Sequence, residues 1–412
     1  MPRISNIHAH KVLNSRGNWT INTEVELEDG AKGHGEIPEG ASKGGREAVS
    51  VNPELAVEII NERLGPNFCG EEAENQYKID QRLIEIDGTP DKSKLGENTL
   101  LSVSIAVAKA VAHSRKIQLF QYLSELFQTK EIGIPTPIFN VINGGKHAQN
   151  DLSFQEFMAI PSRFLPYDKA LDMGAKTYLT LKNLLAEDGF DIEVGDEGGF
   201  APENLHTRQA LDFIVKAAKT AHFKVEEEIF LGLDVASNSF FEKGSYVVKG
   251  EKVKFDAFAL KKFYGELLHD YPIIYIEDMF MEEDLTSWAD FYKGYSEKLL
   301  IVGDDLTVTN TKRLETVAAK KCCNAVIVKP NQIGTLTETY EFVKKAKDLG
   351  MYTIVSHRSG EAVVDTFIAD FAVAVNADYL KAGAPAHERV AKYNKLLEIY
   401  GELNGIEGYC KI

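Results

Sequence analysis

Cysteine is scarce in this chain, and its copies are spaced for neither a metal site nor a redox motif. The 412 residues include only Cys69, Cys322, Cys323 and Cys410, and no CxxC pair occurs among them. Zinc sites and dithiol motifs need closely spaced pairs with residues between them. The pattern therefore predicts four reduced thiols and a reducing compartment.

The chain also lacks a long apolar run and an excess of positive charge. Its longest stretch of small apolar residues, 99–116, is interrupted by Ser102, Ser104 and Lys109. Such a stretch is typical of a buried helix rather than a membrane span. The first twelve residues lack the apolar core of a secretory signal. The net charge of −16 argues against nucleic acid as the main partner. We expect a soluble cytoplasmic protein that binds neither membranes nor nucleic acids.

The first 128 residues have the pattern of a small α+β domain. Residues 21–30 alternate apolar and polar side chains and end in Asp-Gly, which predicts a strand followed by a turn. The Gly-, Pro- and Ser-rich segment 35–50 predicts a loop, with a helix beginning near Arg46. Helical periodicity follows at 54–64, 99–113 and 118–128. Because Pro135 and Pro137 mark a change of pattern, we place two domains at 1–128 and 129–412.

Beyond this boundary, short apolar runs alternate with segments of helical periodicity. Six runs end at a polar residue, and these residues are Asp234, Glu277, Asp304, Lys329, His357 and Lys381. Their separations suit one βα unit each, so the pattern predicts a parallel sheet covered on both faces. We favour a barrel of eight βα-like units. An open doubly wound sheet is the alternative, weakened because no GxGxxG or P-loop motif follows the early strands.

The polar strand ends predict a catalytic site, because the carboxyl ends of barrel strands converge there. The carboxylates of Asp234, Glu277 and Asp304 would repel one another unless a hard cation such as Mg²⁺ bound them. Each residue alone has an ordinary interpretation, such as a helix cap, a salt bridge or a hydrogen-bonded histidine. The ordered series of three acids before two lysines favours a shared site. Nearby cations would lower the pKa of a lysine, so that it could remove a weakly acidic proton next to a carboxylate.

Several motifs make the chain similar to the enolases. They are NSRGN at 14–18, GDEGG at 195–199, GDDLTVTN at 303–310, NQIG at 331–334, SHRSGE at 356–361 and RVAKYNKL at 389–396. The resemblance covers nearly the whole chain. It implies an α+β N-terminal domain that caps a modified eight-stranded βα barrel, whose first units depart from simple βα order. It also implies a lyase that uses Mg²⁺ to dehydrate 2-phosphoglycerate reversibly to phosphoenolpyruvate, in glycolysis and gluconeogenesis, through a lysine base and a metal-stabilised enediolate.

The resemblance assigns a role to each matching residue. Lys329 would remove the C2 proton, and Glu197 with Glu156 would assist loss of the C3 hydroxide. The implied catalytic residues are Lys329, Glu197, Glu156, His357 and Lys381. The implied substrate contacts are His147, Gln155, Glu156, Glu277, Asp304, Lys329, Arg358, Ser359 and Lys381, with the Arg358 guanidinium suited to phosphate oxygens. Two Mg²⁺ ions are implied, and their ligands would be Asp234, Glu277, Asp304 and Ser42, which lies on the closing loop.

The chain departs from the usual enolase pattern at several positions. Glu39 and Lys43 flank Ser42 where serine and threonine are usual, and Trp19, Met279 and Pro330 are also atypical. One interpretation is a drifted surface loop, and another is altered loop closure or substrate choice. Two other functions stay open: a superfamily enzyme acting on a related phosphonate or phosphorylated acid, and a non-catalytic binding or structural protein on this scaffold. The resemblance further implies a homodimer or homo-octamer.

Overall fold

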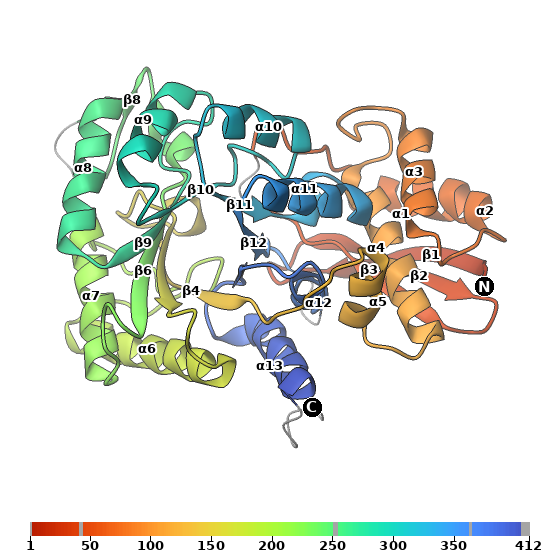
Figure 1. Ribbon diagram of the computed structural model, residues 1–412, viewed down its shortest axis with the longest axis horizontal. Coiled ribbons are helices and arrows are strands. Elements are labelled where there is room, and N and C mark those ends of the chain that lie inside the picture. Colours follow the sequence, from red (N-terminus) through yellow and green to blue (C-terminus); the bar gives the residue numbers. More distant parts are fainter. Residues whose placement is uncertain (1, 41–43, 250–253, 362–364, 405–412) are drawn as a thin grey trace.

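The computed structural model describes residues 2–40, 44–249, 254–361 and 365–404. Its N-terminal part contains a three-stranded antiparallel sheet of β1 (Ile4–Leu13), β2 (Trp19–Leu27) and β3 (Lys32–Glu36). The helices there are α1 (Pro53–Glu58), a π-helix (Ile59–Leu64), α2 (Gly65–Phe68), α3 (Gln76–Asp87), α4 (Glu97–Ser114) and α5 (Leu119–Leu126). Figure 1 shows these red and orange elements gathered on one side of the molecule. The predicted N-terminal α+β architecture is confirmed.

Helix α4 packs directly against the N-terminal sheet because β3 presents glycine to it. A Cβ atom at Gly33 would collide with the backbone of Ala106, and one at Gly35 would collide with that of Ser102. Nearly all residues of α4 are buried, which confirms the buried helix expected from its small apolar side chains. None of the helices in the described part of the chain is long and apolar enough to cross a membrane.

The expected helix start near Arg46 is wrong. Residues 44–52 form turns and extended chain, in which the Glu47 N–H donates to the Gly44 carbonyl at 3.2 Å. The first helix begins at Pro53, where the Asn52 side chain accepts a hydrogen bond from the Leu55 N–H. Proline in the first turn and an asparagine cap favour this start over the glycine-rich segment before it.

The second part of the chain forms a closed barrel of eight strands. These are β4 (Thr136–Asn143), β5 (Glu156–Pro161), β6 (Ile229–Asp234), β9 (Ile273–Glu277), β10 (Leu300–Gly303), β11 (Ala325–Val328), β12 (Tyr352–Ser356) and β13 (Tyr379–Lys381). The order around the barrel is β10-β11-β12-β13-β4-β5-β6-β9. Strand β5 is antiparallel to both β4 and β6, whereas the other neighbours are parallel. The barrel prediction is confirmed, including its irregular first units, and the open-sheet alternative is wrong.

Helices surround the barrel, as Figure 1 shows. They are α6 (Tyr167–Glu187), α7 (Thr207–Thr220), α8 (Ala257–Asp270), α9 (Leu285–Tyr295), α10 (Thr311–Ala319), α11 (Leu336–Asp348), α12 (Phe367–Ala374) and α13 (Val390–Asn404). A small hairpin of β7 (Phe241–Glu242) and β8 (Ser245–Tyr246) follows β6. The predicted domain boundary at 128/129 lies in the connection between α5 and β4.

Apolar side chains fill the inside of the barrel. A buried cluster joins residues of most strands and consists of Ile138, Met158, Ile160, Tyr275, Val302, Ala325, Ile327, Ile354 and Tyr379. Because this core closes the barrel interior, a ligand can bind only at an end. The described cysteines, Cys69, Cys322 and Cys323, are free thiols as predicted, and Cys410 lies outside the described residues.

Candidate active site

The six polar strand ends meet at one end of the barrel. Asp234, Glu277 and Lys381 are the last residues of their strands, and Asp304, Lys329 and His357 follow theirs directly. A single pocket is lined by Gly40, Glu47, His147, Gln155, Glu156, Glu197, Asp234, Ala236, Asp278, Asp304, Asp305, Lys329, Ser356, His357, Arg358, Ser359 and Lys381. The structure therefore brings together all the site residues proposed from the sequence that it describes; Glu277 does not line the pocket but contacts Lys381, which does. Ser42 lies outside the described residues.

Lys381 is surrounded by carboxylates. Its Nζ lies 2.8 Å from Glu277 Oε2, 3.3 Å from Glu156 Oε1 and 3.4 Å from Asp234 Oδ2. Glu156, Asp234 and Glu277 reach it because they occupy matching positions on β5, β6 and β9. Burial lowers the pKa of Lys381, but the three carboxylates outweigh burial and raise it well above its usual value. The three carboxylates therefore favour the charged form of Lys381.

Lys329 has a simpler environment. Its ammonium group pairs with Asp304 Oδ2, and its backbone N–H donates to Thr309 Oγ1 at 2.9 Å. The Gln332 side-chain amide donates to Asp304 Oδ1 at 2.9 Å, so both carboxylate oxygens of Asp304 have a partner. The sequence predicted a lowered pKa for this lysine, but here its pKa is raised. Burial lowers it, as does the charge of Arg358, yet the contact with Asp304 has the larger combined effect.

The site holds more negative than positive charge. Among the described residues, the pocket is lined by seven carboxylates and by only three lysine or arginine side chains. Burial, followed by the charge of Asp234, raises the pKa of Glu277 to about 8. Burial and Asp304 raise that of Asp305 to about 7. Oxygen donors carrying uncompensated charge fit a hard divalent cation.

Two further acids, which the sequence interpretation missed, contribute to this excess. Asp278, Asp304 and Asp305 present oxygen atoms within 4.8 Å of one another. Asp278 also accepts hydrogen bonds from the backbone N–H groups of Asp304 and Asp305, at 3.0 and 2.8 Å. Asp278 and Asp305 follow predicted site residues in the doublets Glu-Asp and Asp-Asp, and this doubling is the signal that could have found them.

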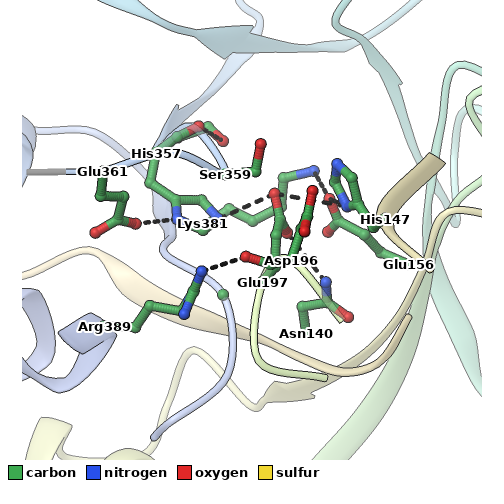
Figure 2. A network of polar contacts seen from close by, with 12 residues as sticks. Asn140, His147, Glu156, Asp196, Glu197, His357, Ser359, Glu361, Lys381 and Arg389 are labelled. Atoms are coloured by element: carbon green, nitrogen blue, oxygen red, sulfur yellow. Dashed lines mark hydrogen bonds and ion pairs between the residues drawn. The ribbon is translucent and has the colours of Figure 1, made fainter. Parts of the chain in front are cut away.

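A second group of acids and histidines lies beside Lys381 and includes His147, Glu156, Glu197 and His357 (Figure 2). Glu197 Oε1 lies 3.3 Å from His357 Nε2 and 3.7 Å from His147 Nδ1. Glu197 Oε2 accepts a hydrogen bond from the Asn140 amide at 3.0 Å. The Glu156 Oε2 atom is buried and has no hydrogen-bond partner among the described residues.

The two glutamates have opposite pKa shifts. Burial and the charge of Glu197 raise the pKa of Glu156 well above its usual value. Burial also opposes ionisation of Glu197, but interactions with His147 and His357 outweigh it and hold that pKa well below the usual range. Such a pair, with one proton-holding and one ionised carboxyl group, can donate and accept protons at one reacting centre.

Two matches with known protein families cover this architecture. Residues 4–123 match the family described as Enolase, N-terminal domain. Residues 131–410 match the family described as Enolase, C-terminal TIM barrel domain. The chain belongs to the enolase family. It is therefore an enzyme, a lyase of the enolase superfamily, and its acid-lined pocket suits the divalent metal use that the fold suggests.

The candidate phosphate contacts of this enolase-family protein lie under its N-terminal segment. Arg358 is buried and its Nη1 lies 2.9 Å from Glu47 Oε2, a partner that the sequence interpretation missed. A Cβ atom at Gly40 would collide with the Arg358 guanidinium. Ser359 lines the same pocket. Glycine therefore allows the chain near residue 40 to lie directly on the arginine.

The atypical positions have different structural roles. Met279 is fully buried, and its carbonyl accepts a hydrogen bond from the Tyr264 hydroxyl at 2.7 Å. Pro330 begins a short 3₁₀ helix (Pro330–Gln332) directly after Lys329. Glu39 exchanges two backbone hydrogen bonds with Gly360, at 2.8 and 3.0 Å, so it ties the N-terminal segment to the phosphate-contact loop. Lys43 lies outside the described residues.

Proposed function

We propose that the protein catalyses the reversible Mg²⁺-dependent dehydration of 2-phosphoglycerate to phosphoenolpyruvate. The observation that carries this proposal is one pocket lined by Lys329 and by two glutamates, Glu156 and Glu197, with opposite pKa shifts. A base and an acid in one pocket suit removal of a proton and loss of a hydroxyl group from adjacent carbons. Arg358 suits the phosphate and Lys381 the carboxylate.

Each side chain in the pocket has a separate role in substrate binding or proton transfer. Arg358 and Ser359 hold the phosphate, and Lys381 orients the substrate carboxylate. Lys329 accepts the C2 proton. Glu156 holds the proton of the glutamate pair and Glu197 is ionised at rest, so the proton passes from Glu156 through Glu197 to the departing C3 hydroxyl, which leaves as water while the C2–C3 double bond forms. Asp234, Glu277, Asp304 and Ser42 would hold Mg²⁺, which would supply positive charge that offsets the negative charge developing on the substrate and would favour the neutral form of Lys329.

The proposal is tested with purified protein, 2-phosphoglycerate and Mg²⁺, following the ultraviolet absorbance of the enol product. We expect turnover that a chelator abolishes and added Mg²⁺ restores. The matched control is the Lys329→Met variant, which keeps the pocket shape but has no base. Wild-type protein that folds, binds Mg²⁺ and leaves 2-phosphoglycerate unchanged would show that the proposed substrate is wrong.

One observation favours a second candidate, the same enolate chemistry on a related phosphorylated acid or phosphonate. Trp19 and Glu39, both atypical for the family, line a cavity of about 250 Å³ beside the active site. This cavity and the catalytic pocket share Gly40 and Glu47 in their walls. A substrate with an additional substituent could occupy it. A panel of such acids, compared by kcat/KM with 2-phosphoglycerate, separates the two candidates.

We further propose that the protein is a cytoplasmic homodimer or homo-octamer. The support is family membership together with the scarcity of cysteine. Light scattering of the purified protein measures the assembly, and a monomeric mass at working concentration would contradict it.

A further inference from the structure

A chain of four buried ionisable residues connects the active site with the C-terminal helix α13. It runs from Glu197 through His357 and Glu361 to Lys392, and each member is at most 4% exposed. His357 Nε2 lies 3.3 Å from Glu197 Oε1. His357 Nδ1 contacts Glu361 Oε1, and Lys392 Nζ pairs with Glu361 Oε2. In Figure 2 the Glu361 carboxylate points at the imidazole of His357 from the side away from Glu197.

The contacts of Glu361 determine which nitrogen of His357 carries a proton. An ionised carboxylate only accepts hydrogen bonds, and a lysine ammonium group only donates them. Because the Lys392 ammonium group donates to one oxygen of Glu361 and the other oxygen contacts Nδ1, we assign the nitrogen that faces Glu361 as a donor. Nδ1 therefore carries a proton, and in the neutral ring Nε2 is left as an acceptor. Within the described residues, Nε2 has no hydrogen-bond partner of good geometry, and Glu197 is the acid beside it.

We propose that Glu361 and Lys392 are positioning residues that hold His357 as its Nδ1–H tautomer, so that Nε2 exchanges a proton with Glu197. The inference rests on the proposed function and deepens it. When Glu197 gives its proton to the departing hydroxyl, the C3–O bond breaks and water leaves with the electron pair of that bond. Nε2 of the neutral ring takes up a proton from solvent and passes it to Glu197 Oε1, so the ring returns to its neutral Nδ1–H form and Glu197 regains the proton it gave.

The charges around His357 fit this role. Glu197 faces Nε2 of the ring and Glu361 faces Nδ1, while Arg389 and Lys392 add positive charge. Burial, followed by the charges of Arg389 and Lys392, outweighs the attraction of Glu197 and lowers the pKa of His357 to about 4. The ring is therefore neutral at rest and holds its second proton only transiently.

A purely structural ion pair would also bury Glu361 and Lys392, so the test needs a matched control. Lys92 and Glu338 form such a pair elsewhere, with Lys92 3% exposed and an N–O distance of 2.8 Å. We compare Glu361→Gln, Lys392→Met and Lys92→Met in the full-length protein. A loss of unfolding free energy in all three variants would reflect the removal of a buried charge. A change in kcat or in its pH profile that is confined to Glu361→Gln and Lys392→Met would reflect the proposed role.

We expect Glu361→Gln to lower kcat by roughly tenfold to a hundredfold while KM changes less than about threefold, as for other groups that orient a catalytic residue. Its acidic limb in the pH profile of kcat should move to lower pH, because the imidazolium loses a neighbouring negative charge. Lys392→Met should lower kcat less, and Lys92→Met should leave kcat and its pH profile unchanged. If Lys392→Met does not fold, the double variant Glu361→Gln/Lys392→Met removes both charges and serves in its place.

A measurement without substrate separates this inference from the proposed function. Nitrogen-15 NMR distinguishes the histidine tautomers, and the His357 signals are those lost in His357→Gln. We expect a protonated Nδ1 in the wild type and a changed tautomer ratio in Glu361→Gln. An Nε2–H tautomer in the wild type, or unchanged kcat and pH profile in Glu361→Gln, would overturn the inference. A wild type inactive on 2-phosphoglycerate but with the expected tautomer would refute the function and leave the positioning intact.

Discussion

The mouth of the barrel has an acidic half and a basic half. The neighbouring strands β6, β9 and β10 end in Asp234, Glu277 and Asp304, whereas β11, β12 and β13 end in Lys329, His357 and Lys381. Burial acts on both halves, and it favours the neutral form in each. It raises the pKa of Asp234 and Glu277 and lowers that of His357. The two lysines keep their charge because they reach across the boundary to carboxylates.

The lysines differ in how many carboxylates they contact, and this difference indicates their roles. Lys381 contacts three and Lys329 contacts one. A cation held by Asp234, Glu277 and Asp304 would take the one carboxylate partner of Lys329, whereas Lys381 would keep Glu156. Lys329 is therefore the better candidate for a base, and Lys381 for a fixed positive charge.

Loss of the base tests this comparison with the largest expected effect. Lys329→Met should reduce kcat by roughly 10³- to 10⁴-fold, because no other described lysine lines the pocket except the carboxylate-bound Lys381. Steady-state kinetics on the active substrate gives the value. Lys320→Met, at an exposed position before β11, is the control and should retain full activity. More than a tenth of wild-type kcat in Lys329→Met would contradict the assignment.

Removal of Lys381 should damage the fold as well as the activity. Lys381→Met leaves three buried carboxylates without their cation, and breaking a buried ion pair in this way costs about 3–5 kcal/mol. Denaturant unfolding in chelator measures the loss of unfolding free energy. Lys329→Met, with one carboxylate partner, is the matched control and should lose less. Equal losses in the two variants would show that the number of contacts does not distinguish the lysines.

The pH dependence of stability sharpens the contrast between neutral histidines and charged lysines. Burial lowers the pKa of His147 to about 4, below about 6.5 for an unfolded histidine. Between these values the unfolded chain binds a proton that the folded chain does not, so the unfolding free energy falls as the pH falls. His147→Gln should reduce the difference between denaturant midpoints at pH 7 and pH 5. His222→Asn, at an exposed site, should leave it unchanged, and identical behaviour of both variants would refute a neutral His147.

The smallest effect is expected at Glu39, in the N-terminal segment that lies against the loop carrying Arg358 and Gly360. Glu39→Ser restores the residue usual in the family and should change KM by less than about fivefold. The effect should be small because Glu39 contacts Gly360 through its backbone, which the substitution leaves in place. Initial rates across a range of substrate concentrations provide the measurement, with Glu28→Ser at an exposed turn as the control. A KM change above tenfold would indicate that the Glu39 side chain selects the substrate.

Much of the site could be predicted because its residues sit at the ends of short apolar runs. The change from Val328 to Lys329 marks a strand end in the sequence, and the barrel turns every such end toward one pocket. The helix start near Arg46 failed because glycine and a downstream Asn52–Pro53 cap outweighed the local pattern. The raised pKa of Lys329 could not be predicted, because it depends on a contact with Asp304, which lies at the end of the neighbouring strand β10.

The sequence by itself determined the alternation of strands and helices and the order of acids and bases at the strand ends, since these follow from local periodicity and from the chain order of the strands, whereas the irregular first units of the barrel were implied by the resemblance to the enolases. The tertiary structure alone decided the partners: three carboxylates around Lys381, Glu47 on Arg358, and Lys392 behind Glu361 and His357. These contacts join residues far apart in the chain, and burial then sets their charges. Local sequence does not specify which residues far apart in the chain come into contact.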